Sequence, residues 1–201
     1  LKQYYKHTFG NLDNWKKFDS MRAEGLLHAP QGSMRFVAVK KKPDYSKYVL
    51  FGDGATRFAM SYDGSDAWQI SVSADEANLQ NIPPKEAMNF VRDASVAGHL
   101  LYPLQPGKRM ELLGTTKVGK FPCYDIKVTL PGGQWLRYAI DMSKFGERRR
   151  TTFNAVNSSE EIITFQDYFM IEDIRFPYLS EMESGGKTVY RMEMLDLQVN
   201  D

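Results

Sequence analysis

The chain has 201 residues, of which 42% are hydrophobic and 25% are charged. These are the proportions of an ordinary globular protein, and they exclude wholesale disorder. Lys and Arg total 26 against 25 Asp and Glu, so the net charge is +1. The chain therefore lacks the excess of basic charge that is typical of nucleic-acid-binding proteins. Its single cysteine, Cys123, can form no intrachain disulfide and is expected to be a small buried apolar residue.

The apolar stretches, the start and the length of the chain give three further expectations. No apolar stretch approaches the roughly 20 residues that a membrane-spanning helix needs. The chain begins at Leu1 without an initiator Met, which suits a mature form from which a leader has been removed. We expect a single domain over residues 1–201, because all-β domains of this length are common.

The first part of the chain predicts a short helix followed by hairpins. Four residues follow helical spacing and have a glycine after them, which predicts a helix that ends near Gly10; they are Leu1, Tyr4, Tyr5 and Thr8. Alternating side chains between turn residues then predict strands. These strands cover residues 33–39, 45–51, 55–62 and 67–70.

A second helix is predicted over residues 83–101. Pro83 and Pro84 suit its first turn. Apolar residues then recur every three or four positions, and charged residues fill the other side; the apolar ones are Ala87, Phe90, Val91, Ala94, Ala97 and Leu101. Such an apolar stripe must cover another surface.

The rest of the chain predicts strands joined by tight turns, at residues 110–118, 121–130, 134–141, 147–153, 161–170, 172–179 and 188–199. Strands joined in this way usually pair as antiparallel neighbours. So many strands exceed what an open sheet holds without curling, and two helices are too few to cover both of its faces. We therefore predict a mainly β fold, an unclosed β-barrel of about 11–12 antiparallel strands that wraps two or more helices.

The sequence holds no motif that indicates catalysis or a metal site. Its three histidines, His7, His28 and His99, lie on different predicted elements, and no zinc-type spacing of His or Cys occurs. Phosphate-binding loops and the Gly-x-Ser-x-Gly motif are also absent. We expect no enzyme, no cofactor and no metal. A catalytic site would need titratable residues clustered in a cavity, and Asp125, Asp141 and His99 are the candidates.

Large apolar side chains are the remaining source of function. The chain has 12 Phe, 11 Tyr, 10 Met and 3 Trp, which form either an ordinary core or the lining of a cavity for a flexible apolar ligand. Strand alternation groups Phe58 with Met60 and Tyr62, and Tyr138 with Ile140, but leaves open which face is inside. The expected lining residues are Phe36, Phe58, Met60, Tyr62, Trp68, Phe90, Val91, Tyr138 and Ile140.

Short turn-and-strand motifs follow one another along nearly the whole chain. They are Lys42-Pro43-Asp44-Tyr45, Tyr62-Asp63-Gly64, Trp68, Gly119, Tyr124-Asp125-Ile126, Gly132-Gly133, Ile140-Asp141, Asp167-Tyr168 and Ile174-Arg175-Phe176-Pro177. Their order and spacing resemble those of the outer-membrane lipoprotein-sorting proteins, a family similar to the periplasmic lipoprotein carrier LolA.

The resemblance implies an unclosed β-barrel with helices as a lid over an apolar cavity. It implies a periplasmic protein that shields the acyl chains of a lipid or lipoprotein during transfer, with an inner- or outer-membrane protein as a further partner. In the carrier an Arg precedes the Pro of the first motif and latches the lid by hydrogen bonds. This chain has Lys42 at that latch position, and Lys does not form the bidentate fork of Arg. The family's Gly before the Ile-x-Phe-Pro strand is replaced by Glu172-Asp173.

Two non-enzymatic functions therefore stand side by side. The leading hypothesis is a periplasmic carrier that binds lipid or lipoprotein acyl chains in an apolar cavity. The alternative is a periplasmic protein-interaction or envelope-stress sensor module on the same fold, which should show an exposed apolar patch outside the cavity.

Overall fold

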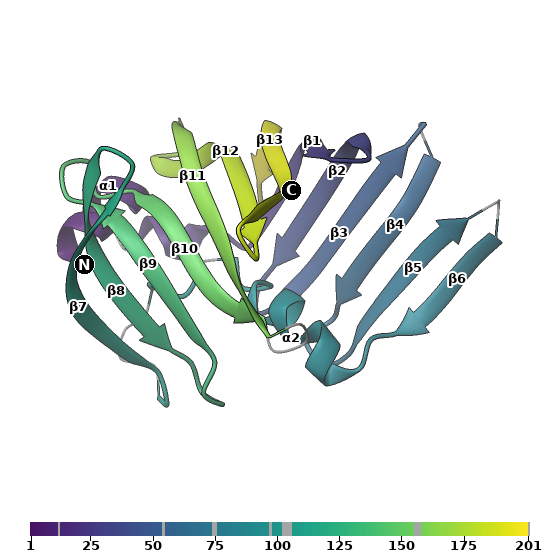
Figure 1. The fold of residues 1–201 in the computed structure, drawn as a ribbon, viewed down its shortest axis with the longest axis horizontal. Coiled ribbons are helices and arrows are strands. Elements are labelled where there is room, and N and C mark those ends of the chain that lie inside the picture. Colours follow the sequence, from purple (N-terminus) through teal and green to yellow (C-terminus); the bar gives the residue numbers. More distant parts are fainter. Residues whose placement is uncertain are drawn as a thin grey trace. The chain divides into compact units, whose positions relative to one another are not determined.

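The computed structural model describes residues 1–11, 13–53, 55–73, 76–96, 98–101, 106–154 and 158–200. These residues form one unclosed antiparallel sheet of 13 strands in the order β6-β5-β4-β3-β2-β1-β13-β12-β11-β10-β9-β8-β7 (Figure 1). The mainly β, unclosed antiparallel fold predicted from the sequence is confirmed, with one or two strands more than expected.

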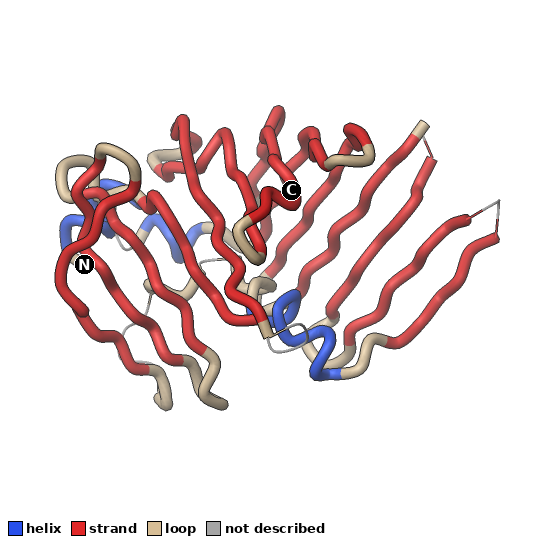
Figure 2. The backbone as a smooth tube through the Cα atoms, in the orientation of Figure 1, coloured by secondary structure: helices blue, strands red, loops and turns tan. Residues whose placement is uncertain are grey.

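Strands make up most of the described chain, and helices are short (Figure 2). The helical elements are α1 (Lys2–Phe9), the 3₁₀ helix η1 (Asn14–Lys17) and α2 (Pro84–Arg92). The strands are β1 (Ser20–Ala29), β2 (Gly32–Lys41), β3 (Tyr45–Gly52), β4 (Ala55–Tyr62), β5 (Ala67–Ser73), β6 (Glu76–Asn81), β7 (Arg109–Val118), β8 (Phe121–Thr129), β9 (Trp135–Asp141), β10 (Glu147–Asn154), β11 (Ser159–Ile171), β12 (Ile174–Ser184) and β13 (Lys187–Val199). Among the described residues, neither α-helix has the length and apolar character needed to cross a membrane.

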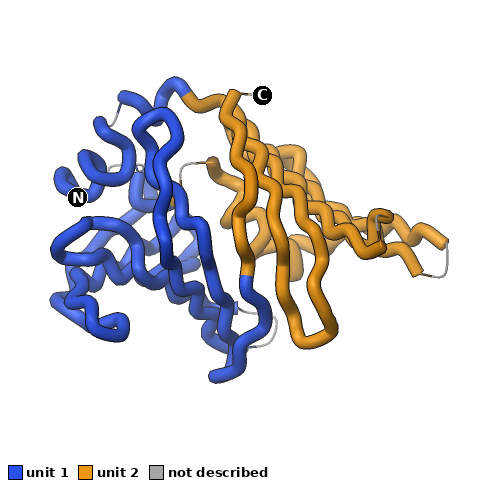
Figure 3. Tube along the Cα trace, turned by 90° about the horizontal axis from the view of Figure 1, so that it is seen from above, with its two compact units in different colours: residues 1–17, 99–191 blue, residues 18–98, 192–201 orange. Residues whose placement is uncertain are grey.

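The chain forms two compact units (Figure 3). Unit 1 comprises residues 1–17 and 99–191, with α1 and β7–β12, and unit 2 comprises residues 18–98 and 192–201, with α2 and β1–β6. Strand β13 contributes its first residues to unit 1 and its remainder to unit 2. The single domain over residues 1–201 stays a prediction.

Two strands carry no clear alternation in the sequence and were not expected. Strand β1 places Gly25 where an added Cβ would lie 1.9 Å from the carbonyl oxygen of Glu193 in β13, so only glycine fits there. Strand β6 is exposed at every residue. Because β6 has no buried face, it leaves no alternating pattern to recognise.

The first predicted helix is confirmed, whereas the second is shorter than predicted. Helix α1 is followed by Gly10 with φ 67°, a left-handed conformation that glycine favours. Helix α2 ends at Arg92, so the expectation of a helix through residue 101 is wrong. The Arg92 guanidinium donates to Asn89 at 3.0 Å and twice to Asp93 at 3.1 Å, and Gly98 has φ 65°.

The apolar residues that were expected to continue this second helix have other places. Leu101 is buried in unit 1 rather than on a helical stripe, as is its neighbour Leu100. Ala97 lies outside the described residues. The 3.6-residue spacing beyond Arg92 therefore reflects burial in a non-helical segment.

Candidate functional site

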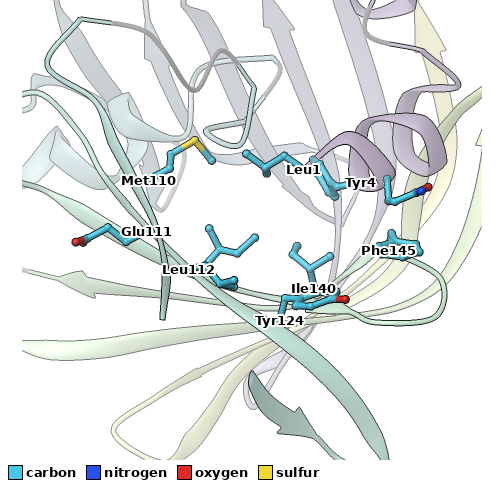
Figure 4. A pocket seen from close by; sticks show the side chains of 10 residues that line it. Leu1, Tyr4, Met110, Glu111, Leu112, Tyr124, Ile140 and Phe145 are labelled. Atoms are coloured by element: carbon cyan, nitrogen blue, oxygen red, sulfur yellow. The ribbon is translucent and has the colours of Figure 1, made fainter. Parts of the chain in front are cut away.

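A cavity of about 310 Å³ lies in unit 1 between α1 and strands β7–β9 (Figure 4). Its volume falls at the lower end of the roughly 300–1,000 Å³ that is typical of small-molecule sites. The lining is mainly apolar and consists of Leu1, Gln3, Tyr4, Met110, Glu111, Leu112, Tyr124, Ile126, Ile140 and Phe145.

Strand register explains why these side chains converge. Directly opposed residues of an antiparallel pair point to the same face. Leu112 of β7 is opposite Ile126 of β8, and Tyr124 of β8 is opposite Ile140 of β9. Alternation puts Tyr124 and Ile126 on one face. This face, which we call the inner face of unit 1, forms one wall of the cavity, and α1 forms the other.

Three contacts hold α1 over the inner face. The Tyr4 hydroxyl donates to Glu147 Oε1 at 2.8 Å, and the Tyr5 hydroxyl donates to the carbonyl oxygen of Leu100 at 2.8 Å. His7 stacks on Phe145, with ring centroids 5.2 Å apart. Hydrogen bonds and stacking thus hold the helix at three positions between Tyr4 and His7.

Glu147 joins the polar groups beneath α1. Burial raises the pKa of Glu147 above its ordinary value, and the nearby Arg150 and the hydrogen bond from Tyr4 oppose this shift without cancelling it. Burial, and then the charge of Glu147, raise the pKa of Tyr4 and Tyr168. The Tyr168 hydroxyl donates to the backbone carbonyl of Glu147. Tyr4 is therefore at once a wall of the cavity and a hydrogen-bond donor to this cluster.

A tight turn after β9 brings Phe145 to the cavity. Phe145 has φ 53°, and its backbone N–H donates to the carbonyl oxygen of Asp141 at 2.9 Å. The Asp141 carboxylate accepts hydrogen bonds from the Ser143 hydroxyl and from the backbone N–H groups of Ser143 and Lys144, at 2.7–2.9 Å. Arg148 contacts the other oxygen at 2.9–3.0 Å. Burial alone would raise the pKa of Asp141, but these hydrogen bonds outweigh it and lower the pKa well below its ordinary value.

The two carboxylates considered for catalysis do not enter the cavity. Asp125 follows Tyr124 in β8 and is opposite Ala139, whereas Tyr124 is opposite Ile140. The Asp125 side chain therefore lies on the face of the sheet opposite to the inner face. Asp125 forms an ion pair with Arg137, and Asp141 with Arg148. Among the described residues, no group of three His, Cys, Asp or Glu side chains is placed to hold a metal ion.

Two residues that were expected to line the cavity lie in unit 1. Ile140 lines the cavity and is 2% exposed. Tyr138 is 1% exposed and is opposite Ile126, so it lies on the inner face beside the cavity without lining it. Alternation grouped these two residues correctly.

The other expected lining residues belong to unit 2. Phe36 is opposite Leu50, and Leu50 is opposite Phe58, so Phe36 and Phe58 point to the same face of the sheet. Met60 and Tyr62 alternate with Phe58 along β4 and share this face. Trp68 is opposite Ser61, so it lies on the other face of this part of the sheet. The structure therefore brings four of these residues onto one face and leaves Trp68 on the other.

Helix α2 lies on the same side as these four residues. Lys40 is opposite Ser46, which is opposite Tyr62, so all three side chains share that face. The Lys40 Nζ donates to the carbonyl oxygen of Asp93, directly after α2. On α2 itself, Phe90 and Val91 are half-buried.

The latch position is also in unit 2. Lys42 Nζ lies 3.7 Å from Asp19 Oδ1, and the Lys42 backbone N–H donates to the Asp19 carbonyl oxygen at 2.8 Å. This side chain therefore contacts the segment between η1 and β1.

Sequence reasoning missed most of the lining residues of unit 1, although part of the signal was present. Leu1 and Tyr4 belong to the helical stripe that predicted α1, and Tyr124 and Ile126 alternate within a predicted strand. Nothing in the sequence indicated that the first helix covers strands more than a hundred positions later. Phe145 was missed because its place depends on the turn that Asp141 organises.

Comparisons with known proteins add the fold. No family model matches the sequence, and neither does any curated protein. Solved structures do match. One is a DUF1329 family protein from Desulfovibrio piger, with 12% identity over 100% of this chain and 93% of that chain and a TM-score of 0.64. Another is a LolA superfamily protein from Nitrosomonas europaea, with 13% identity over 100% and 92% of the two chains and a TM-score of 0.63.

A third match is a domain from Vibrio parahaemolyticus named for outer membrane lipoprotein sorting. It is 12% identical over 90% of this chain and 86% of that chain, with a TM-score of 0.59. The chain has the LolA-like fold. Identities this low show the fold alone, so the LolA-like sheet and its cavity define the site, and the ligand must be argued from the residues.

Proposed function

We propose that this chain is a periplasmic, non-enzymatic carrier that binds acyl chains of lipids or lipoproteins in the unit 1 cavity. The observation that carries the proposal is the mainly apolar cavity between α1 and β7–β9. Two of the similar structures, one named as a LolA superfamily protein and one named for outer membrane lipoprotein sorting, support the periplasmic setting and the class of ligand.

The size of the cavity limits what it holds. A methylene group is close in size to a water molecule, which occupies about 30 Å³ of the liquid. A cavity of about 310 Å³ therefore accommodates on the order of ten methylene groups. Each buried methylene contributes about 0.8 kcal/mol before the cost of immobilising the chain. One acyl chain thus binds reversibly, as a carrier requires.

An acyl-probe experiment tests the proposal. The protein is titrated into a fluorescent fatty-acid probe, and the purified protein is examined by native mass spectrometry before and after organic extraction. Ile126→Trp, which fills the cavity, should weaken probe binding at least tenfold. Ile70→Trp places the same bulk on a half-buried strand position of unit 2 and should leave binding unchanged. Absence of probe uptake together with bare polypeptide in the mass spectrum would refute the proposal.

A protein-interaction module is the second candidate, and exposed apolar side chains outside the cavity favour it. Leu79 is 66% exposed, Leu195 59% and Met170 53%. They lie on three different strands, and singly exposed apolar residues are ordinary. This candidate therefore has less support than the carrier. Pull-down from envelope extract with and without detergent separates the two, because a protein partner remains bound in detergent whereas an acyl ligand is displaced.

A further inference from the structure

Strand β7 ends the sheet beside the cavity. In the strand order it is the last member, and within the described residues its single strand neighbour is β8. The outer edge of such a strand presents backbone N–H and C=O groups that an added strand can bind. An extended peptide binds other sheets in this way, with backbone hydrogen bonds supplying affinity and pockets selecting side chains.

The cavity reaches this edge. Three consecutive residues of β7, Met110, Glu111 and Leu112, line it. Successive side chains of a strand point to opposite faces, so a cavity confined to one face would meet alternate residues. Figure 4 shows the Glu111 carboxylate turned away from the other lining side chains. Glu111 thus borders the cavity near its backbone, and the strand that ends the sheet is also a wall of the cavity.

The edge has one of the features that usually block pairing, a bulge between Leu112 and Gly114, and lacks others. Natural edge strands are often short or carry proline and inward-pointing charges. Strand β7 is 10 residues long and has no proline, and Glu111 is the single charged residue between Arg109 and Lys117. Leu112 is 67% exposed and Leu113 is 51% exposed, next to a bulge that ends at Gly114.

We propose that β7 and the cavity form one composite site for an acylated peptide, with the acyl chain in the cavity and the attached extended backbone paired to the free edge of β7. The proposal rests on the proposed function and adds a second contact to it, between the edge of β7 and the backbone to which the acyl chain is attached. The cavity selects hydrocarbon and the edge selects extended backbone. Their adjacency makes the second contact intramolecular once the first has formed.

Three ligands test the composite site on the unmodified protein. They are an N-dodecanoyl hexapeptide of alternating Val and Thr, the same peptide with an N-acetyl group, and dodecanoyl methylamide. Calorimetry or competition with the fluorescent probe gives each dissociation constant. We expect the acylated peptide to bind at least about tenfold more tightly than the methylamide, a difference of about 1.4 kcal/mol. The acetylated peptide should not compete measurably.

N-methylation of the peptide identifies edge pairing specifically. Alternate residues of an edge-paired strand direct their N–H groups toward β7 or away from it. Two acylated peptides, methylated at odd or at even positions, should therefore differ: one loses the gain over the methylamide and the other keeps it. A nonspecific apolar contact would bind the two methylated peptides with equal affinity.

The outcomes separate this inference from the proposed function. If the methylamide binds and the peptide adds less than about twofold, or if both methylated peptides bind equally, the composite site is refuted and the carrier proposal stands. If sedimentation equilibrium shows a dimer that Leu113→Glu dissociates, and the peptide gives no gain, a second copy occupies the edge and the inference is likewise overturned. If neither the methylamide nor the acylated peptide binds, the carrier proposal itself fails.

Discussion

The Tyr4 hydroxyl donates a 2.8 Å hydrogen bond to Glu147 Oε1, across 143 positions of sequence. This contact ties α1 to β10, and Tyr4 also lines the cavity. The closing wall of the cavity is therefore held by a polar contact to a buried carboxyl group rather than by apolar packing alone.

Tyr4→Phe should destabilise the protein by about 1–3 kcal/mol, because it removes a donor from a buried carboxyl group while keeping the ring. Urea unfolding at pH 7 measures the change. Tyr45→Phe removes a hydroxyl from an exposed tyrosine and should change the free energy of unfolding by less than about 0.5 kcal/mol. Equal effects of the two substitutions would contradict the role given to Tyr4.

Glu147 should make stability fall as the pH rises above the acidic range. Burial raises the folded-state pKa above the ordinary value of 4.5. The folded protein therefore binds this proton more tightly than the unfolded chain, so the stabilising contribution is complete below pH 4.5 and is lost as the pH rises through the folded-state pKa.

Glu147→Gln should remove that dependence, because Gln stays neutral and its carbonyl oxygen can still accept from Tyr4. The unfolding free energy of the variant, relative to the unmodified protein, should increase as the pH rises from 4.5 through the folded-state pKa of Glu147 and should level off above it. Glu76→Gln, on an exposed strand, supplies the control profile. A difference that stays constant across this pH range would show that Glu147 does not titrate in the folded protein as inferred.

The sequence was sufficient for the fold but only partly for the site. Alternation and turn residues predicted most strands, because a strand with one buried face leaves a period of two. The same alternation grouped Tyr138 with Ile140 correctly. Trp68 was expected to line the same cavity as Tyr62, but it is opposite Ser61 and so lies on the other face, because the face that a residue shares with the next strand depends on register.

Long-range placement was the part that the sequence could not supply. The sequence predicts two helices, and the expected lining included residues of the second one alone, Phe90 and Val91. The stripe beyond Arg92 proved to be non-helical, while α1 covers the described cavity. Local spacing does not report which distant strands a helix meets, and it does not identify β7 as the strand left at an edge.

Asp141→Ala should destabilise the protein by about 3 kcal/mol, since it leaves Arg148 without its buried partner and removes the hydrogen bonds that hold the turn before Phe145. Because the pKa of Asp141 is lowered in the folded state, Asp141 stabilises the protein more at neutral than at acidic pH. Its contribution to the free energy of unfolding is present above the ordinary pKa of 3.8 and is lost as the pH falls through the folded-state pKa. Urea unfolding at pH 7 and pH 3 measures both effects. Asp196→Ala, at an exposed position, should have little effect at pH 7. A loss of stability that is no larger at pH 7 than at pH 3 would contradict this assignment.

Gly25→Ala should destabilise unit 2 by about 3 kcal/mol or more, the upper end of the range for overpacking. The added Cβ would lie 1.9 Å from the Glu193 carbonyl oxygen and 2.7 Å from Phe36 Cε1. Phe36 is a side chain that can be shortened, whereas the carbonyl belongs to the backbone of β13. Phe36→Leu in the Gly25→Ala background should therefore give no recovery.

Gly146→Ala is the matched control, because its added Cβ would meet only the Tyr168 ring at 3.8 Å, an ordinary contact. It should change the unfolding free energy by less than about 1 kcal/mol. Thermal unfolding of both variants, with the yield of folded protein, measures the contrast. The contrary result is a free energy of unfolding for Gly25→Ala within about 1 kcal/mol of that of the unmodified protein. It would mean that β1 and β13 separate easily at this point, and that the close approach at Gly25 does not hold unit 2 together.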